Sequence, residues 1–346
     1  MHSFNQLNLS SDSLKILKGL KFENPTPIQE KVIPVALQGN DVMGTAQTGS
    51  GKTLSYILPI VEKLRKNVND KFLILAPTRE LSEQVFSVAK IFLGHGKPFK
   101  AINLIGGKGI FSQINQLKKN PQIIIGTPGR INDLLERKSL SLSKCSIVVL
   151  DEMDRMLDMG FGYQVDKIMK QVNKNRQMIM LSATIPAQIR KVSSKYLNNP
   201  VNISIENNDV IETNIKQKVI KTIPNEKVDE LINQIDQRKG SILIFAKTKI
   251  GVDKLVKKLK ANSVKASALH GGMRQNKRSK IMQNFRDERF RILVATDIAS
   301  RGLDVPHIEH IINYDMPQAP EDFIHRIGRT ARAGSIGEAV SFLTQK

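Results

Sequence analysis

The sequence predicts an α/β fold with two domains, each built around a parallel β-sheet. Short apolar runs that end in polar or glycine-containing turns alternate with longer amphipathic stretches along the whole chain. Runs of this length, separated by helical periodicity, are typical of buried parallel strands joined by right-handed crossovers. At 346 residues the chain is also too long for one ordinary core and fits two domains of common size.

Twelve apolar runs are expected to form the strands. Those of the first half are residues 41–46, 72–77, 101–106, 122–127, 147–151 and 178–182. Those of the second half are residues 215–221, 241–246, 265–270, 291–297, 310–315 and 339–343. The intervals between them carry the helical periodicity, so each half should form its own sheet with crossover helices.

The boundary between the halves is expected at a polar interval. Residues 206–213 read ENNDVIET, lack helical periodicity and follow the turn sequence NNP at 198–200. We therefore expect an N-terminal domain of residues 1–206, a flexible linker of residues 207–213 and a C-terminal domain of residues 214–346.

The charge favours a polyanionic partner. The formal net charge is +21, with 28 basic and 16 acidic residues up to residue 206 and 25 basic and 16 acidic residues after it. An excess shared by both halves indicates two folded basic surfaces, with nucleic acid as the expected partner. The alternative is a soluble basic protein without such a partner.

Other features bound the class of protein. Cys145 opens an apolar run and is expected to be buried rather than catalytic, and the six histidines lack metal-ligand spacing. The N-terminus resembles no signal peptide, and no apolar run has membrane-spanning length. No heptad seam or large apolar face is evident. We therefore expect a cytoplasmic protein that does not bind a membrane and is a monomer.

A phosphate-binding loop is predicted at residues 46–53, AQTGSGKT, between a strand and a helix. Its glycines allow the backbone to wrap around phosphates, to which successive N–H groups and the helix N-terminus present partial positive charge. Lys52 should reach the β- and γ-phosphates, and the Thr53 hydroxyl should ligate Mg²⁺. The expected ATP ligands in this loop are Thr48, Gly49, Ser50, Gly51, Lys52 and Thr53.

Acidic residues at a later strand end complete the predicted hydrolytic site. The segment VVLDEMD at 148–154 places Asp151 where a carboxylate holds Mg²⁺ through its waters, and Glu152 is the expected base for the attacking water. Acids at a strand end can instead be solubilising caps, but a phosphate-binding loop upstream favours the catalytic interpretation.

Two residues near the N-terminus are candidates for holding adenine. The Phe22 ring can stack on a purine, and the Gln29 carboxamide can pair with the adenine edge while rejecting guanine. Each residue taken by itself would be assigned differently, with Phe22 in the core and Gln29 on the surface.

With these motifs in order, the chain resembles the DEAD-box family of ATP-dependent RNA helicases over almost its whole length. The Q motif matches residues 22–29, with an upstream aromatic at Phe4, and motif I matches residues 46–53. The further matches are PTREL at 77–81, GG at 106–107, TPGR at 127–130, DEMD at 151–154, SAT at 182–184, ILIFAKT at 242–248, ATDIASRGLD at 295–304 and HRIGRTAR at 325–332. The resemblance implies two RecA-like domains, with ATP and Mg²⁺ as cofactors.

The resemblance also implies roles for residues far from the phosphate loop. Arg329 and Arg332 correspond to arginine fingers that neutralise charge on the transferred phosphoryl group, and Gly302 and Asp304 lie in the motif that binds the ribose. Ser182 and Thr184 resemble the hydroxyl pair that bonds the motif II acids and couples hydrolysis to strand separation.

Met153 is a departure, because the family has alanine there. Enlarging a packed alanine position typically costs about 1–3 kcal/mol unless its neighbours adjust. Methionine fills irregular gaps well, and Met43, Met178 and Met180 lie on nearby predicted strands. We expect the acids to keep their roles and the coupling to the SAT motif to change.

The loops at the strand ends are candidate RNA contacts with phosphate- and sugar-binding chemistry and no base-reading groups. They supply Pro77, Thr78, Arg79, Gly106, Gly107, Thr127, Pro128, Gly129, Arg130, Arg278 and Thr296. No aromatic residue falls in these loops, so backbone contacts should dominate and binding should be sequence-independent and salt-sensitive.

We therefore expect an RNA-stimulated ATP hydrolase that unwinds short RNA duplexes or remodels RNA–protein complexes as its domains close. A DNA-translocating helicase is a rival that the Q motif and PTREL disfavour. An RNA clamp or annealing scaffold that binds ATP without unwinding is a second rival, supported only by Met153. The sequence does not identify the RNA substrate.

Overall fold

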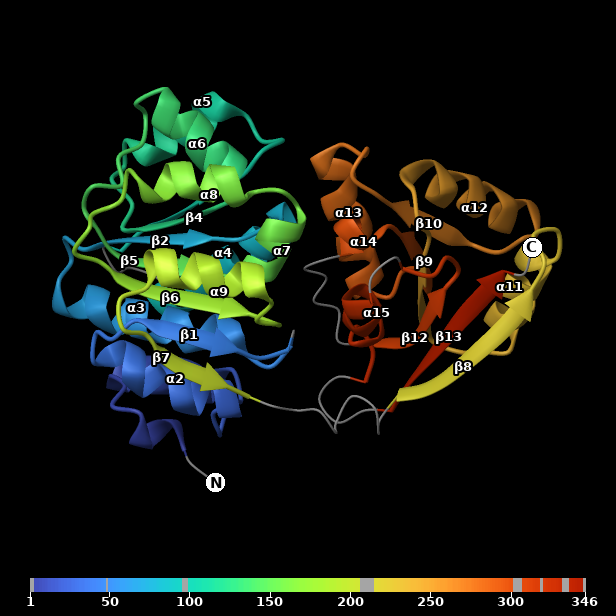
Figure 1. Cartoon of the computed structure of the whole chain (residues 1–346), viewed down its shortest axis with the longest axis horizontal. Coiled ribbons are helices and arrows are strands. Elements are labelled where there is room, and N and C mark those ends of the chain that lie inside the picture. The colour runs from blue at the N-terminus through green and yellow to red at the C-terminus, as the bar shows by residue number, and fades with distance from the viewer. Residues whose placement is uncertain are drawn as a thin grey trace. The chain divides into compact units, whose positions relative to one another are not determined.

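The chain folds into two compact units, residues 1–206 (unit 1) and residues 207–346 (unit 2). The structure is a computed structural model, which describes residues 3–47, 49–94, 99–205, 215–300, 307–317, 320–331 and 336–344. The expected linker, 207–213, lies outside the described residues. Figure 1 shows the elements of each unit.

Unit 1 contains a seven-stranded parallel sheet of order β3-β4-β2-β5-β6-β1-β7. Its strands are β1 (Val42–Thr45), β2 (Lys71–Leu75), β3 (Ala101–Leu104), β4 (Ile123–Gly126), β5 (Cys145–Leu150), β6 (Gln177–Ser182) and β7 (Val201–Ser204). The central strands are buried on both faces, which is why they appear in the sequence as continuous apolar runs.

Helices cover both faces of this sheet (Figure 1). One face carries η1 (Phe4–Gln6), α1 (Ser11–Gly19), α2 (Pro27–Leu37), α3 (Lys52–Lys66) and α4 (Arg79–Leu93). The other carries α5 (Ile110–Leu117), α6 (Pro128–Glu136), α7 (Met153–Asp158), α8 (Gly162–Met169) and α9 (Ala187–Tyr196).

Unit 2 contains a six-stranded parallel sheet of order β10-β11-β9-β12-β13-β8. Its strands are β8 (Ile215–Thr222), β9 (Ser241–Phe245), β10 (Ala266–Leu269), β11 (Ile292–Ala295), β12 (Ile308–Asn313) and β13 (Gly337–Thr344). One face packs against α11 (Lys227–Asp236) and α12 (Lys249–Ala261). The other packs against α13 (Gln275–Arg286), α14 (Asp297–Ser300) and α15 (Pro320–Ile327).

The predicted fold class is confirmed, and all twelve predicted strands occur. The sequence did not reveal β7, whose four residues VNIS bury only Ile203 and which pairs with β1 at the sheet edge. All strands within a sheet are parallel, so the loops that follow them gather at one edge of that sheet. Open α/β sheets bind ligands at this edge.

Candidate functional site

The phosphate loop of unit 1 has the geometry that its glycines predict. Gly49 and Gly51 adopt φ of 88° and 89°, in the left-handed region that glycine occupies without strain. Lys52 begins α3, is buried, and donates from Nζ to the Ala46 carbonyl at 2.7 Å. The buried Ser50 hydroxyl has no hydrogen-bond partner among the described residues, and Thr48 lies outside them. The loop thus gathers an ammonium, a hydroxyl and a helix N-terminus where phosphates bind.

Gln29 supports this loop from α2. Its Nε2 donates to the Gly51 carbonyl at 3.0 Å, and its Oε1 accepts from the Thr26 amide at 3.0 Å. A Cβ on Gly51 would stand 2.4 Å from Gln29 Nε2, so only glycine fits against the carboxamide. The Gln29 side chain is therefore built into the nucleotide loop.

The two adenine candidates have the opposite burial from what their residue types alone suggest. Phe22 is 47% exposed and Gln29 is 4% exposed. Phe22 is held near α1 through its amide, which donates to the Leu17 carbonyl at 2.9 Å. Phe4, expected as an upstream aromatic of the motif, is 3% exposed and packs in the core, so its ring is not available to a ligand.

Asp151 follows β5 and is joined to the phosphate-loop helix by Tyr56. The Tyr56 hydroxyl donates to Asp151 Oδ2 at 2.7 Å, and Tyr56 lies on α3 three residues after Thr53. Burial, reinforced by the neighbouring Glu152 charge and opposed by Lys52, raises the pKa of Asp151 to about 6. Tyr56 was not predicted from the sequence, although its place three residues after Thr53 puts it on the same helix face.

The two predicted Mg²⁺ ligands fit a cation. Asp151 Oδ1 is buried without a hydrogen-bond partner among the described residues, and its other oxygen accepts from Tyr56, which lies on the same helix as Thr53. A carboxylate and a hydroxyl are the hard oxygen donors that Mg²⁺ prefers. A bound cation would also oppose the factors that raise the pKa of Asp151.

Glu152 is held in one orientation by a buried arginine. Its Oε2 accepts from Arg155 at 2.7 Å, and both side chains are almost fully buried. Glu152 also adopts φ 52°, ψ 53°, a left-handed conformation uncommon for a residue with a side chain. Such strained residues cluster at functional sites, which agrees with the catalytic interpretation of Glu152.

Asp154 links the acidic segment to the SAT motif. Its Oδ2 accepts from the Ala183 and Thr184 amides at 3.0 and 3.3 Å. The Ser182 hydroxyl donates to the Thr184 carbonyl at 2.6 Å. The link between the acidic segment and the SAT motif is therefore made by backbone amides to Asp154, the last acid of DEMD, rather than by the expected hydroxyl bonds of Ser182 and Thr184.

Met153 is the first residue of α7, between Glu152 and Asp154 in the sequence, and its side chain is 1% exposed. It belongs to the same buried cluster as Met43, Met178 and Met180, as the strand positions suggested. Three flexible thioether side chains on neighbouring strands explain how the larger residue is accommodated.

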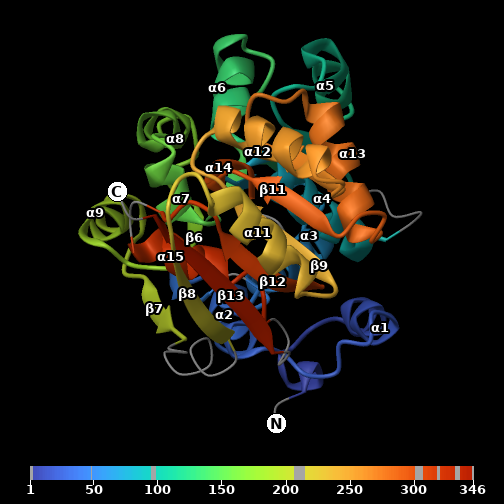
Figure 2. The ribbon, with the colours of Figure 1, turned by 90° about the vertical axis from the view of Figure 1, so that its right-hand side faces the viewer.

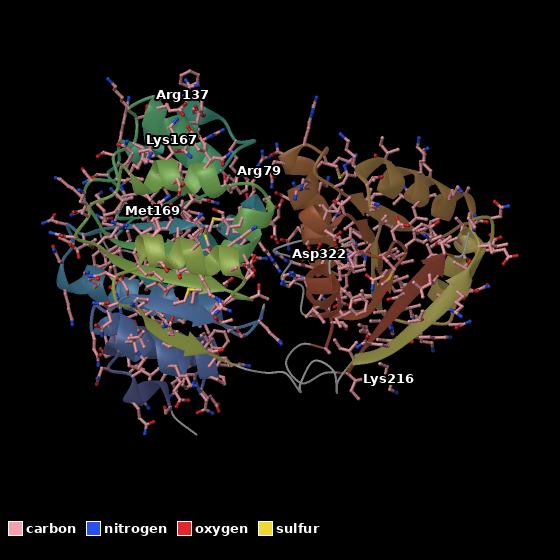
Figure 3. The ribbon with its side chains drawn as sticks, viewed as in Figure 1. Arg79, Arg137, Lys167, Met169, Lys216 and Asp322 are labelled. Atoms are coloured by element: carbon pink, nitrogen blue, oxygen red, sulfur yellow. The ribbon has the colours of Figure 1, made fainter. Side chains whose placement is uncertain are left out.

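The candidate RNA loops of unit 1 meet at the carboxyl ends of β2, β3 and β4. Thr78 caps α4 by accepting from the Leu81 amide at 3.2 Å, and Pro77 precedes it. The Arg79 guanidinium lies over Gly106, where a Cβ would stand 2.9 Å from Nη2. Figure 3 shows Arg79 at the rim of unit 1 where the strands end.

The neighbouring loop after β4 adds a second basic group to this rim. Pro128 begins α6 after the buried Thr127, and a Cβ on Gly129 would meet no heavy atom of the described residues within 4 Å beyond its chain neighbours and the backbone of its own helix. Arg130 donates from Nη1 to the Lys108 carbonyl at 3.2 Å, just beyond Gly107, which has φ 81°. The structure therefore gathers the unit 1 candidates at one sheet edge.

Unit 2 places its described candidates after β11, on α13, which lies between β10 and β11 in the chain, and after α15. Thr296 follows β11 and donates its amide to the Leu269 carbonyl at 3.3 Å, while the Arg278 side chain on α13 is buried. Arg329, just after α15, is buried and donates its amide to the Arg326 carbonyl at 3.1 Å. Gly302, Asp304 and Arg332 lie outside the described residues.

Arg326, which was not predicted as a site residue, organises this region. It pairs with Asp297 at 2.5 and 2.7 Å and donates to Asn313 Oδ1 at 3.0 Å. Its guanidinium lies 4.8 Å from the centre of the Phe245 ring. Arg326 therefore joins α15 to α14 and two strands, a structural role within the motif that also contains Arg329.

No helix among the described residues is long and apolar enough to cross a membrane. Within the same residues, no group of three or more His, Cys, Asp or Glu side chains is arranged to hold a metal.

Two family models match the sequence, one in each unit. "DEAD/DEAH box helicase" matches residues 26–192, and "Helicase conserved C-terminal domain" matches residues 224–334. The ATP-dependent RNA helicase CshA of Listeria monocytogenes is 41% identical over 99% of this chain and 66% of its own length. The DEAD-box ATP-dependent RNA helicase CshA of Geobacillus kaustophilus is 41% identical over 100% of this chain and 74% of its own length. The chain thus spans about two thirds to three quarters of these relatives.

Solved structures resemble the whole chain. S. cerevisiae Dbp5 bound to RNA and ADP BeF3 has a TM-score of 0.89 and 30% identity, covering 100% of this chain and 90% of that one. Mss116p bound to ssRNA and AMP-PNP has a TM-score of 0.90 and 29% identity, covering 99% of this chain and 75% of that one. These similarities extend over both units.

Proposed function

The chain belongs to the DEAD-box family of ATP-dependent RNA helicases, whose members hydrolyse ATP, and from this premise we propose its specific activity. It hydrolyses ATP when RNA is bound, and it uses this cycle to separate short RNA duplexes or to remodel RNA–protein complexes. The observation that carries the proposal is the hydrogen bond from Tyr56, on the helix that follows the phosphate loop, to Asp151, which immediately precedes Glu152 in the sequence.

Each side chain of this edge has a distinct task in the proposed reaction. Lys52 leaves the Ala46 carbonyl for the phosphates, Phe22 and Gln29 hold adenine, and Glu152 orients the attacking water while Arg155 fixes its carboxylate. Thr53 and Asp151 would hold Mg²⁺, which when bound neutralises charge on the phosphates.

Unit 2 completes the site in this proposal. Arg329 and Arg332 act as arginine fingers on the γ-phosphate, and Gly302 and Asp304 bind the ribose. A finger contributes about 10³–10⁵ in rate in related nucleotide hydrolases. Domains joined by a linker move relative to one another by default, so closure of the two units is the step that ATP and RNA favour together.

RNA is the proposed partner because two similar proteins, Dbp5 and Mss116p, are described as bound to RNA. The rim carrying Arg79 and Arg130 in unit 1, with Arg278 and Thr296 in unit 2, would hold the sugar–phosphate backbone. Contacts of this kind are independent of sequence and weaken steeply with salt. A monomer acting in the cytoplasm is the simplest setting for this activity.

Strand separation of a short labelled RNA duplex tests the proposal. We expect separation with ATP, none without nucleotide, and no repeated turnover with a non-hydrolysable analogue. Arg332→Ala should abolish RNA-stimulated hydrolysis while ATP binding stays nearly intact, and Arg289→Ala, on the exposed surface of unit 2, is the matched control. RNA binding without strand separation would instead identify a clamp or scaffold.

A further inference from the structure

A strongly basic segment surrounds one edge of the unit 2 sheet. Residues 254–286 contain ten lysines and arginines and no aspartate or glutamate. They include most of α12, all of β10 and all of α13, and β10 is an edge strand that pairs only with β11 among the described strands. Because α12 and α13 pack on opposite faces of the sheet, the basic residues of this segment lie on both sides of its β10 edge. Figure 2 shows the ribbons of the two helices.

A hollow of about 450 Å³ lies at the amino end of β10. Its walls include Lys260 from the end of α12, Ser263 and Lys265 from the turn before β10, Ser267 from β10, and Phe290. Thr296, the candidate RNA residue of the same sheet, follows the carboxyl end of β11. The hollow is therefore at the opposite end of the strands from the proposed RNA loops.

Phe290 is a fixed aromatic wall of this hollow. Its ring stacks on Phe285 with centroids 5.4 Å apart and an interplanar angle of 29°, and Phe285 is fully buried. Phe285 in turn lies 5.6 Å from the His307 ring. A half-buried ring held in this way offers a platform that needs no ordering when a ligand binds.

The lysines of the hollow are available for an anion. Lys260 and Lys265 are exposed and have no carboxylate partner among the described residues. The acids that border the basic segment have other partners: Asp253 bonds His270 at 3.1 Å, and Asp287 accepts from Gln283 at 2.8 Å. Among the residues that the structure describes, neither lysine of the hollow is therefore paired with a carboxylate.

We propose that this hollow binds one nucleotide of single-stranded RNA outside the helicase site, with the base on Phe290 and the flanking phosphates on Lys260 and Lys265. An aromatic platform beside basic side chains is the combination with which proteins hold single strands. The inference rests on RNA as the partner of the proposed function. It supplies the base-stacking group that the strand-end loops lack.

Binding of labelled single-stranded RNA at several salt concentrations tests the inference, with one RNA just long enough to stimulate hydrolysis and a second extended at both ends. For the extended RNA, Lys260→Ala/Lys265→Ala should lower the slope of log affinity against log salt by about 0.7 per lysine. Phe290→Leu, which keeps an apolar side chain against Phe285, should weaken binding by about five- to 150-fold, the effect of one stacked base. Hydrolysis stimulated by the short RNA should stay unchanged.

Lys257→Ala/Lys258→Ala is the matched control, because both lysines are exposed on α12 and neither lines the hollow. Equal losses in the two double variants would overturn the site in favour of general charge. Unchanged affinity for the extended RNA would also overturn it and leave an acidic protein segment as the occupant. Failure of the proposed function can be told apart from failure of this inference, because ATP hydrolysis by the unmodified protein would then be the same with and without RNA. If the unmodified protein bound no RNA at all, this inference would be wrong as well.

Discussion

At the scale of single residues, the nucleotide loop depends on a close fit between Gln29 and Gly51. Gly51 combines φ 89° with a position where a Cβ would stand 2.4 Å from Gln29 Nε2. Any side chain there must both strain the backbone and displace the carboxamide.

Gly51→Ala should therefore weaken ATP binding by about tenfold or more, since an alanine held at positive φ costs on the order of 1–3 kcal/mol. Titration with a fluorescent ATP analogue measures this. Gly109→Ala is the control, because Gly109 has φ −56° and a Cβ added there would meet no heavy atom within 4 Å beyond its immediate chain neighbours. Equal affinity in the two variants would contradict the fit described here.

Met153 stands where the family resemblance of the sequence leads us to expect alanine. Met153→Ala removes a buried side chain beside Asp154, at a cost of about 2–5 kcal/mol. It should alter RNA stimulation of hydrolysis more than the basal rate, because Asp154 holds the Ala183 and Thr184 amides. Met169→Ala is matched, since Met169 belongs to the same cluster but lies on α8 (Figure 3). Unchanged rates with and without RNA would refute the coupling role.

At the scale of elements, α15 depends on one buried arginine. Arg326→Ala leaves Asp297 and Asn313 without their shared partner, so it should lower the free energy of unfolding of unit 2 by about 3–5 kcal/mol. Urea unfolding followed by circular dichroism measures this change. Arg289→Ala, which breaks an exposed 3.7 Å ion pair, should change stability by less than about 1 kcal/mol. If Arg326→Ala changed the free energy of unfolding as little as Arg289→Ala does, contacts other than those of Arg326 would hold α15 in place.

The strand β5 carries the only cysteine of the chain and so provides a probe of unfolding. Burial raises the pKa of Cys145 from 9.0 to about 12, so the native thiol keeps its proton where the unfolded thiol loses it. This contribution to stability is present below pH 9 and is lost as the pH rises toward 12. At about pH 8, iodoacetamide should modify the unfolded chain rapidly and the native chain slowly. Equal rates would contradict the burial of β5.

Strands that form continuous apolar runs could be predicted from the sequence. Features that depend on tertiary contacts could not. The central strands are apolar on both faces and therefore stand out in the sequence. β7 buries one residue against β1 and leaves no such pattern. Gln29 is buried, although its residue type alone suggests the surface, because it bonds Gly51, 22 residues away. Phe22 is exposed, although its residue type alone suggests the core. Asp154 was recognised only as part of DEMD and given no role of its own, because its partners are backbone amides, which carry no sequence signal.

At the scale of the whole molecule, the proposed activity requires ATP and RNA to act on the same equilibrium. In the proposed mechanism, ATP binds unit 1, unit 2 supplies the arginine fingers and RNA contacts both units, so each ligand should increase the affinity for the other by the same factor. Coupling of this kind typically amounts to about 5–150-fold. RNA titrations with and without a non-hydrolysable ATP analogue measure it. Identical RNA affinities would separate nucleotide binding from domain closure.

Steady-state ATP hydrolysis measured without nucleic acid, with single-stranded RNA, and with DNA of the same sequence tests the proposed activity most directly. We expect strong stimulation by RNA and little by DNA, because in the proposed mechanism RNA binding is the step that brings the arginine fingers of unit 2 to the ATP on unit 1. Hydrolysis that is indifferent to RNA would contradict this activity.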